Sequence, residues 1–215
     1  CSGFNYDDDS IAGFSQTHLN GTGVPDLGDI RMLPFNQNLQ GERFFCRYER
    51  ETQVAMPGYY SVKLADMNID VELTVTERTA MHKYTFNQPG EANLLLDLQN
   101  GLVFNSKNIR YRVLEGEVEM LDNKTIAGYN RVRGWVARYF YYMIVFDRPY
   151  TVKKELPQEE GEKAKRFILE FDLKEGESVQ VKVALSTVGI EGAKMALDKE
   201  NPGWNFESIK AETNG

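Results

Sequence analysis

Apolar and polar residues alternate along much of this chain, and the alternation restricts the fold more than any other sequence feature. In IDVELTVT, residues 69–76, apolar side chains occupy every second position, as they do in 60–64, 167–173 and 179–185. Successive side chains of a β-strand point to opposite faces of a sheet, so a period of two predicts strands with one buried face. We expect 60–64 and 69–76 to form one hairpin. The glycine-containing KEGE, residues 174–177, predicts a second hairpin between the last two segments.

The segment VARYFYYMIVFD, residues 136–147, differs because both of its faces are apolar or aromatic. A strand with this composition is covered on both sides, either within a sandwich or by a second layer. Further short strands are expected at NLLLDL (93–98), IRYRVL (109–114) and VEML (118–121), with turns at Gly90, Asn100-Gly101, Gly116 and Asp122-Asn123. Such closely spaced strands, with almost no helical periodicity before residue 188, predict an all-β fold: an antiparallel two-sheet β-sandwich.

The last 28 residues have a different pattern. Ile190, Ala193 and Leu197 recur at helical spacing, the pattern breaks at Asn201-Pro202-Gly203, and it resumes after residue 205. These helices have too little apolar surface to be stable alone. The sequence therefore predicts a β-sandwich domain over 1–187 and a short C-terminal helical linker over 188–215.

Charge and composition exclude several classes of partner. The net charge is −7, with 25 basic and 32 acidic residues, and the basic residues are scattered. No basic stripe follows a phosphate backbone, so nucleic acid is excluded as a partner, and a mildly acidic surface suits neutral ligands such as sugars. No apolar run approaches the ~20 residues that span a bilayer. Cys1 and Cys46 form a disulfide, two free thiols, or one buried and one exposed thiol, and their spacing does not predict zinc.

The segment GFSQTHLNGTGVPDLGDI, residues 13–30, is too rich in glycine for a helix and too polar for a buried strand. No lysine follows its GTG and no helix begins there, which excludes a nucleotide-binding loop. Two interpretations are open. It is an ordered surface loop whose hydroxyl and carboxylate groups bind its own backbone, or it is a ligand-facing loop on a rigid sandwich. His18 within it is a general acid, a ligand-orienting donor or a buried, hydrogen-bonded side chain.

Other residue types that carry chemistry favour structural interpretations. His82 lies in TAMHKYTF, a predicted strand, and shares a face with Tyr84, which indicates a structural residue. The acidic run 7–9 lacks EF-hand spacing and is typical of a solvated turn. The aromatic residues at 139–142, with Trp135 just before them, form either a sugar-stacking platform or, as is more common at strand spacing, part of the core.

The opening segment SGFNYDDDSIAGFSQTHLNGTGVPDLGDI, residues 2–30, resembles the N-terminal signature of glycoside hydrolase family 92, the exo-acting α-mannosidases. Further segments agree in order along the chain: PGYYSVKL, IDVELTVTERTAMHKYTF, YFYYMIVFDRPY, VQVKVALSTVGIEGAKMAL and NPGWNF. The resemblance implies a sandwich similar to galactose mutarotase, paired with a larger helical catalytic domain. It also implies calcium-dependent hydrolysis of terminal α-mannosides with inversion, which requires two carboxyl groups on opposite faces of the sugar.

By the same resemblance, the catalytic carboxylates and most calcium ligands belong to the helical domain, so no catalytic residue and no metal ligand is assigned to this chain. The resemblance further implies that a segment is missing upstream of the sandwich and that the linker over 188–215 leads to a catalytic domain absent from this sequence. The expected partners are a mannose-containing glycan and the helical catalytic domain of the same protein. The expected location is the periplasm or the cell surface of a bacterium. Gln16 departs from the histidine that is common in the family at this position.

The candidate site residues follow from the motif and its aromatic neighbours. The candidate substrate-binding residues are Tyr6, His18, Thr22, Asp26 and Trp135, and the candidate loop-structuring residues are Gly21, Gly23 and Asp29. For Asp26 and Asp29 we expect a loop-fixing role more than direct sugar contact. A stand-alone carbohydrate-binding module is the alternative function. A sugar epimerase is disfavoured, because the two histidines lie 64 positions apart in segments that match a different family.

Overall fold

The computed structural model describes residues 8–18, 26–36, 44–101, 112–134 and 137–213, and these contain thirteen strands and two helices. The strands are β1 (Ser10–Ile11), β2 (Arg31–Phe35), β3 (Cys46–Met56), β4 (Tyr59–Leu64), β5 (Ile69–Val75), β6 (Thr79–Phe86), β7 (Ala92–Asp97), β8 (Val113–Met120), β9 (Thr125–Val132), β10 (Arg138–Phe146), β11 (Tyr150–Glu155), β12 (Arg166–Phe171) and β13 (Ser178–Ser186). The helices are α1 (Ile190–Glu200) and α2 (Phe206–Thr213).

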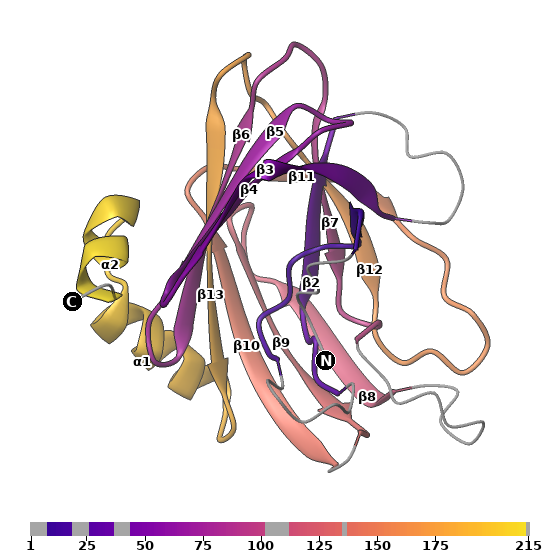
Figure 1. The fold of residues 1–215 in the computed structure, drawn as a ribbon. Coiled ribbons are helices and arrows are strands. Elements are labelled where there is room, and N and C mark those ends of the chain that lie inside the picture. The colour runs from indigo at the N-terminus through magenta and orange to yellow at the C-terminus, as the bar shows by residue number, and fades with distance from the viewer. Residues whose placement is uncertain (1–7, 19–25, 37–43, 102–111, 135–136, 214–215) are drawn as a thin grey trace.

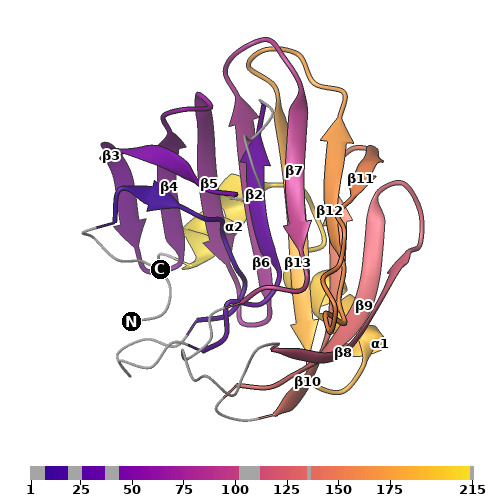
Figure 2. The ribbon, with the colours of Figure 1, turned by 90° about the vertical axis from the view of Figure 1, so that its right-hand side faces the viewer.

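The strands form two antiparallel sheets that face each other. The larger sheet has the order β1-β3-β4-β5-β6-β13-β10-β9-β8, and the smaller has the order β11-β12-β7-β2. The smaller sheet lies in front of the larger one in Figure 2, and both helices lie on the outer face of the larger sheet in Figure 1. The all-β, two-sheet sandwich predicted from the alternation is confirmed. Neither helix has the length and apolar character that a membrane span requires.

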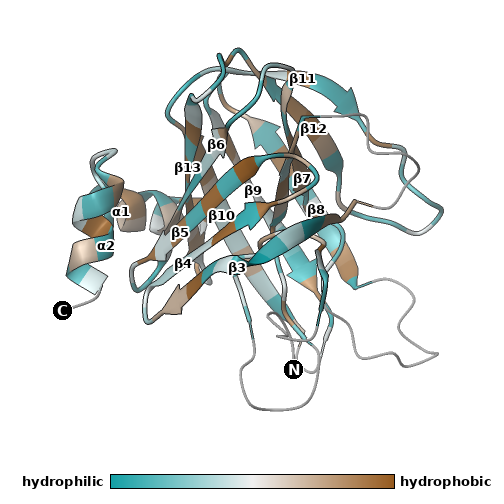
Figure 3. Cartoon of the chain, turned by 45° about the horizontal axis from the view of Figure 1, so that its top comes forward, coloured by the Kyte–Doolittle hydropathy of each residue, from teal (hydrophilic) through white to brown (hydrophobic). Residues whose placement is uncertain are grey.

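The core fills the space between the sheets with the residues that the alternation placed on one face. Val62 and Leu64 of β4 and Ile69 and Val71 of β5 are all at most 2% exposed. Brown and teal residues alternate along these strands in Figure 3. Burial of each such side chain contributes about 1.5–3 kcal/mol. The hairpin expected from these two segments is also confirmed, since β4 and β5 pair from Tyr59↔Thr74 to Leu64↔Ile69.

The hairpin predicted around KEGE is wrong. β12 pairs with β11 and β7 in the smaller sheet, whereas β13 pairs with β10 and β6 in the larger one. The short connection over residues 172–177 therefore crosses from one sheet to the other. The alternation is the same in both arrangements, because strands of either sheet turn one apolar face to the common core.

The turn predicted at Gly116 is also wrong. Gly116 lies inside β8, opposite Asn130 of β9, next to a register shift between Val113 and Glu115. A Cβ atom at this position would lie 2.5 Å from the Asn130 Oδ1 atom. Close packing against Asn130 therefore requires glycine at position 116. Glycine inside a strand often marks such a close approach, so it does not by itself indicate a turn.

β10 is covered on both faces, as its composition predicted. It lies between β13 and β9, with Phe140, Tyr142 and Ile144 in the core between the sheets. On the outer face, Met143 packs against α1 together with Ala184 of β13. Tyr139 is 41% exposed, so the aromatic run contributes to the core at alternate positions.

Both helices are held to the outer face of the larger sheet by polar contacts as well as by apolar packing. Glu200 of α1 accepts hydrogen bonds from Thr76 Oγ1 at 2.7 Å and from Arg78 Nε at 2.6 Å. In α2, Phe206 packs edge-on against Tyr59, with ring centroids 6.4 Å apart. Lys182 of β13 lies beneath the connection between the helices and is 5% exposed. That these helices lead into a further domain stays a prediction.

Replacing Lys182 with methionine is expected to lower the free energy of unfolding by about 1–3 kcal/mol, because it leaves a buried carbonyl without a donor. The Lys182 ammonium donates to Asn201 O at 2.7 Å and lies 4.2 Å from the Trp204 ring centroid, and burial lowers its pKa. Urea unfolding measures the change. Lys194→Met on the exposed face of α1 is the matched control, and an equal effect of both substitutions would contradict this role.

Cys46 is buried with a free thiol whose pKa burial raises to about 12. It opens β3 and pairs with Ile11 of β1. Cys1, the other cysteine of the chain, lies outside the described residues. Burial makes the Cys46 thiol unreactive in the folded protein.

Candidate functional site

The two ends of the glycine-rich segment run antiparallel to each other along the sandwich. Phe14 pairs with Met32 and His18 pairs with Leu27, and Gln16 N–H donates to Asp29 O at 2.9 Å. The Phe14 ring is buried and lies 6.4 Å from each of the Tyr60 and Tyr84 rings. The aromatic residue near the start of the segment therefore anchors it to the core. Residues 19–25 at its tip, including Gly21, Thr22 and Gly23, lie outside the described residues.

Asp29 is the centre of a buried ionic cluster that fixes this segment. It is 1% exposed, and its Oδ2 atom accepts hydrogen bonds from Thr17 Oγ1 at 2.7 Å and from Arg138 at 2.6 Å. Its Oδ1 atom lies 2.5 Å from a guanidinium nitrogen of Arg112, which is also buried. The cluster joins both arms of the segment to the chain before β8 and to the start of β10. The loop-structuring role expected for Asp29 stays a prediction, and these contacts are the ones that it would use.

Asp26 is also buried, at 4% exposure. Its Oδ1 atom accepts a hydrogen bond from Leu27 N–H at 2.7 Å, and its carboxylate lies against the backbone of Gly134, where a side chain would clash. Asp26 therefore braces the start of the second arm against the residue before Trp135. Its direct contact with a sugar stays a prediction, and Tyr6 and Trp135 themselves lie outside the described residues.

The side chain of Gln16 faces the core. Its Nε2 atom lies 3.1 Å from His82 Nε2, and His82 Nδ1 lies 2.6 Å from Tyr84 Oη. Because the Gln16 amide nitrogen donates, His82 Nε2 accepts and the proton of the neutral ring is on Nδ1. Burial lowers the pKa of His82 to about 3. The prediction that His82 is a structural strand residue is confirmed, since it lies in β6 at 2% exposure.

His18 is exposed, unlike His82. Its Nε2 atom lies 3.1 Å from the Ser15 carbonyl oxygen and 3.2 Å from Ser15 Oγ. A carbonyl oxygen only accepts, so Nε2 carries the proton and Nδ1 of the neutral ring is an acceptor. His18 is thus held in one orientation by its own segment.

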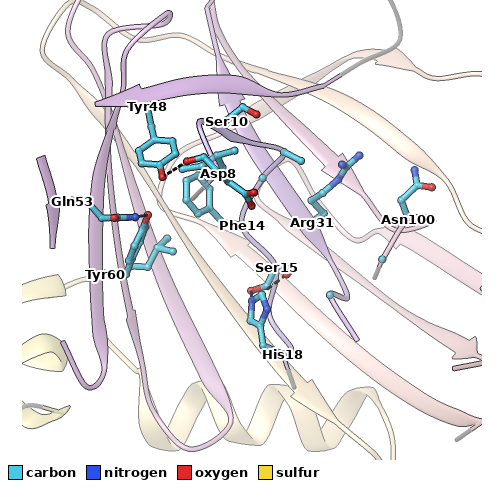
Figure 4. A pocket seen from close by; sticks show the side chains of 16 residues that line it. Asp8, Ser10, Phe14, Ser15, His18, Arg31, Tyr48, Gln53, Tyr60 and Asn100 are labelled. Carbon is cyan, nitrogen blue, oxygen red and sulfur yellow. Dashed lines mark hydrogen bonds between the residues drawn. The ribbon is translucent and has the colours of Figure 1, made fainter. Parts of the chain in front are cut away.

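His18 lies at the edge of a cavity of about 490 Å³ that we call the loop pocket, lined among others by Phe14, His18, Arg31, Tyr48, Tyr60 and Asn100. Figure 4 shows Tyr48 and Tyr60 on one side, Arg31 and Asn100 on the other, and Phe14 between them. The Tyr60 Oη atom accepts a hydrogen bond from Gln53 Nε2 at 2.7 Å, and burial raises the pKa of this phenol. The pocket therefore combines aromatic faces with fixed donors and acceptors, which suits a hydroxyl-rich ligand.

The donors on one side of the loop pocket are fixed by a buried carboxylate. Asp97, at the end of β7, is fully buried and accepts hydrogen bonds from Arg31 at 2.5 Å and from the Asn100 side chain at 2.9 Å. The backbone N–H groups of Gln99 and Asn100 donate to its other oxygen. Sequence reasoning missed Arg31, Asn100 and the two tyrosines as pocket residues. The sequence feature that could have found them is Asp97, a carboxylate within the apolar run NLLLDL, because a buried carboxylate requires partners.

Comparison with known proteins gives the family of this chain. A family model described as the glycosyl hydrolase family 92 N-terminal domain matches residues 1–186. The chain belongs to glycosyl hydrolase family 92. A search of curated proteins gave no match.

Solved structures of family 92 enzymes have the same fold. The family GH92 α-mannosidase BT3965 from Bacteroides thetaiotaomicron is 29% identical with a TM-score of 0.82, and the match covers 99% of this chain and 31% of that protein. The GH92 glycosyl hydrolase ccman5 is 23% identical over 98% of this chain and 30% of its own, with a TM-score of 0.79. The inverting mannosidase BT2199 from Bacteroides thetaiotaomicron VPI-5482 is 19% identical over 98% of this chain and 28% of its own, with a TM-score of 0.78. This family 92 chain thus spans about a third of the length of these relatives.

The described residues of the family 92 domain do not fit a calcium ion. Calcium takes six to eight oxygen ligands, and within the described part of the chain no three histidine, cysteine, aspartate or glutamate side chains gather where an ion would bind. The carboxylates of Asp26, Asp29 and Asp97 each serve backbone or guanidinium donors. No step of a reaction is therefore assigned to calcium held by these residues.

The loop pocket and the two helices of the family 92 domain lie on opposite faces of the larger sheet. Tyr59 packs against Phe206 of α2, whereas the next residue, Tyr60, lines the loop pocket. Adjacent residues of a strand point to opposite faces. The larger sheet therefore separates the loop pocket from both helices.

Proposed function

We propose that this chain is the N-terminal domain of a calcium-dependent, inverting exo-α-mannosidase, and that the loop pocket forms one wall of its substrate cleft. Membership of family 92 and a TM-score of 0.82 to an α-mannosidase of that family support the reaction class. The observation that carries the cleft wall is the loop pocket itself. It lies beside the signature segment and presents aromatic faces opposite fixed donors.

The division of labour follows from the chemistry of inversion. A protonated carboxyl group assists the leaving oxygen while a carboxylate activates water on the opposite face, and the two stand about 6.5–9.5 Å apart. In the loop pocket the only carboxylate among the described lining residues is that of Asp8. We therefore assign the acid, the base and any calcium ligands to a helical catalytic domain of the same protein, and assign substrate positioning to this chain.

The described residues of the loop pocket can position a sugar substrate. Tyr48 and Tyr60 offer faces on which a pyranose ring packs, and His18 Nδ1 accepts from a hydroxyl. Arg31 and Asn100 donate from orientations that Asp97 fixes. Groups that are held before the substrate arrives lose little entropy when it binds, which favours the transition state. Mannose-containing glycans outside the bacterial cytoplasm are the substrates we propose.

The isolated chain is expected to hydrolyse no aryl α-mannoside in the presence of calcium, because it supplies no acid–base pair. Release of the aryl alcohol, followed against buffer, measures this. Turnover clearly above buffer would refute the proposed division of labour.

A stand-alone carbohydrate-binding module is the second candidate, and the aromatic lining of the loop pocket is the observation that favours it. It predicts measurable affinity without a second domain. Calorimetric titration of the isolated chain with mannobiose separates the two functions, because half of a cleft binds too weakly to give a signal. Strong binding by the isolated chain would favour the module.

A further inference from the structure

The lining of the loop pocket includes an asparagine that is followed directly by a glycine, Asn100-Gly101. In this dipeptide the backbone nitrogen of the glycine can attack the asparagine side-chain amide, because glycine has no side chain that hinders the approach. The attack is intramolecular, so its rate depends on how often the two groups meet in the reacting geometry. The contacts of the two residues therefore decide whether the pair reacts in the folded chain.

Close packing requires glycine at position 101. A Cβ atom there would lie 2.7 Å from Arg112 Nη1 and 2.9 Å from the Leu27 carbonyl oxygen. Arg112 is 5% exposed and is paired with the buried Asp29. A side chain at position 101 would therefore displace the ionic cluster that joins the signature segment to the chain before β8.

The contacts of Asp97 favour asparagine at position 100. The Asn100 Nδ2 atom donates to Asp97 Oδ2 at 2.9 Å, and the Asn100 backbone N–H donates to Asp97 Oδ1 at 2.8 Å. Asp97 is fully buried and also accepts from Arg31. An aspartate at position 100 would place a second carboxylate against the first, and like charges repel. The fold thus contains a labile dipeptide because each of its residues makes a contact that depends on its type.

The same contacts hold Asn100 away from the reacting geometry. Ring closure requires its side chain to rotate about the Cα–Cβ bond until Cγ meets the Gly101 nitrogen. One carboxylate holds both the backbone N–H and the side-chain amide of Asn100, which restrains this rotation. Figure 4 shows Asn100 on the same side of the loop pocket as Arg31, the other side chain that Asp97 holds. Reaction therefore requires a local opening in which the bonds to Asp97 break.

We propose that Asn100-Gly101 is a deamidation site, which the buried carboxylate of Asp97 protects in the folded chain. In the reaction the Gly101 nitrogen loses its proton to hydroxide and attacks Asn100 Cγ. The Nδ2 group takes up a proton from water and leaves as ammonia. Water then opens the cyclic imide at either carbonyl, which gives aspartate or isoaspartate.

The product changes the loop pocket. It lacks the side-chain amide that donates to Asp97, and its new carboxylate repels the carboxylate of Asp97. The isoaspartate form also lengthens the backbone by one methylene group, next to the position where Gly101 packs closely against Arg112. This modification is independent of the reaction proposed for the pocket.

Peptide mass spectrometry after incubation at mildly alkaline pH tests the proposal. We compare the rate of deamidation at Asn100 in the folded chain with the rate in the chain unfolded by urea. The folded rate is expected to be at least about tenfold lower, because only the open fraction reacts. Asn20-Gly21 and Asn214-Gly215 of the same unfolded chain give the reference rate for unrestrained pairs.

Asp97→Asn is expected to raise the rate at Asn100 in the folded chain by at least about fivefold, because it weakens a charge-assisted hydrogen bond. Asp66→Asn is the matched control, since Asp66 pairs with Arg47 instead. Circular dichroism shows which variants fold. Asp97→Glu, which keeps the charge for Arg31 but moves the carboxylate, takes the place of Asp97→Asn if that variant does not fold.

Three results would overturn the proposal. Equal rates at Asn100 in folded and unfolded wild-type chain would show that the contacts give no protection. A rate at Asn100 far below the two reference pairs in the unfolded chain would show that this pair is not a deamidation site. A wild-type rate in a folded Asp97 variant would show that the protection comes from another part of the fold.

Discussion

Replacing Asp29 with asparagine is expected to lower the free energy of unfolding by about 3–5 kcal/mol, because removing one member of a buried ionic cluster leaves charge uncompensated. Arg112 is buried beside it and loses its carboxylate, and Arg138 loses a bond of 2.6 Å. The asparagine side chain has the same shape, so the loss reports charge and not packing. Urea unfolding followed by circular dichroism measures the change.

Asp66→Asn is the matched control for this substitution. Asp66 pairs with Arg47 at 2.9 Å, but the Arg47 side chain is 74% exposed. An exposed ion pair contributes about 0–1 kcal/mol, so the control is expected to cost much less. If both aspartates can be replaced at equal cost, the buried cluster does not hold the signature segment in place.

Acidification is expected to destabilise the wild-type chain more than His82→Gln, by about 3 kcal/mol between pH 7 and pH 4. Burial lowers the pKa of His82 from 6.5 to about 3 in the folded chain. The unfolded chain therefore binds a proton below about pH 6.5 while the folded chain stays neutral. The stabilisation that depends on neutral His82 is present above pH 6.5 and is lost as the pH falls towards 3.

Urea unfolding at several pH values measures this difference. Every other titratable group is common to the two proteins, so its contribution cancels when the two profiles are subtracted. Protonation also removes the acceptor that His82 Nε2 offers to Gln16. We therefore expect the amide signals of residues 14–18 to change together with the loss of stability. Parallel pH profiles would contradict the burial of a neutral His82.

The alternation of apolar residues predicted the strands because burial on one face leaves a period of two in the sequence. It predicted the pairing of β4 with β5 correctly, but it did not predict the pairing of β12 and β13. The alternation of β12 and β13 is compatible with one hairpin. The structure instead places β12 in the smaller sheet and β13 in the larger sheet, on opposite sides of the core. Gly116 shows the same limit, since a glycine in a strand and a glycine in a turn look alike until the neighbouring Asn130 is placed.

The site was predicted in part, for a related reason. The motif identified the segment that carries His18 and Asp29, and the geometry gives each a defined partner. Arg31, Tyr60 and Asn100 belong to the same pocket but lie far apart in the sequence, in segments with no motif of their own. Their convergence depends on how the two sheets pack, which no local pattern of residues contains.

A structure of the protein including the proposed catalytic domain, bound to mannoimidazole, tests the central proposal most directly. The structure of an α-mannosidase of this family that is 28% identical to this chain is known in complex with mannoimidazole. We expect the ligand to lie within about 4 Å of residues of the loop pocket, the range of direct contact, with a carboxyl group of the other domain on its far side. A ligand enclosed by the other domain alone, with the loop pocket open to solvent, would contradict the account.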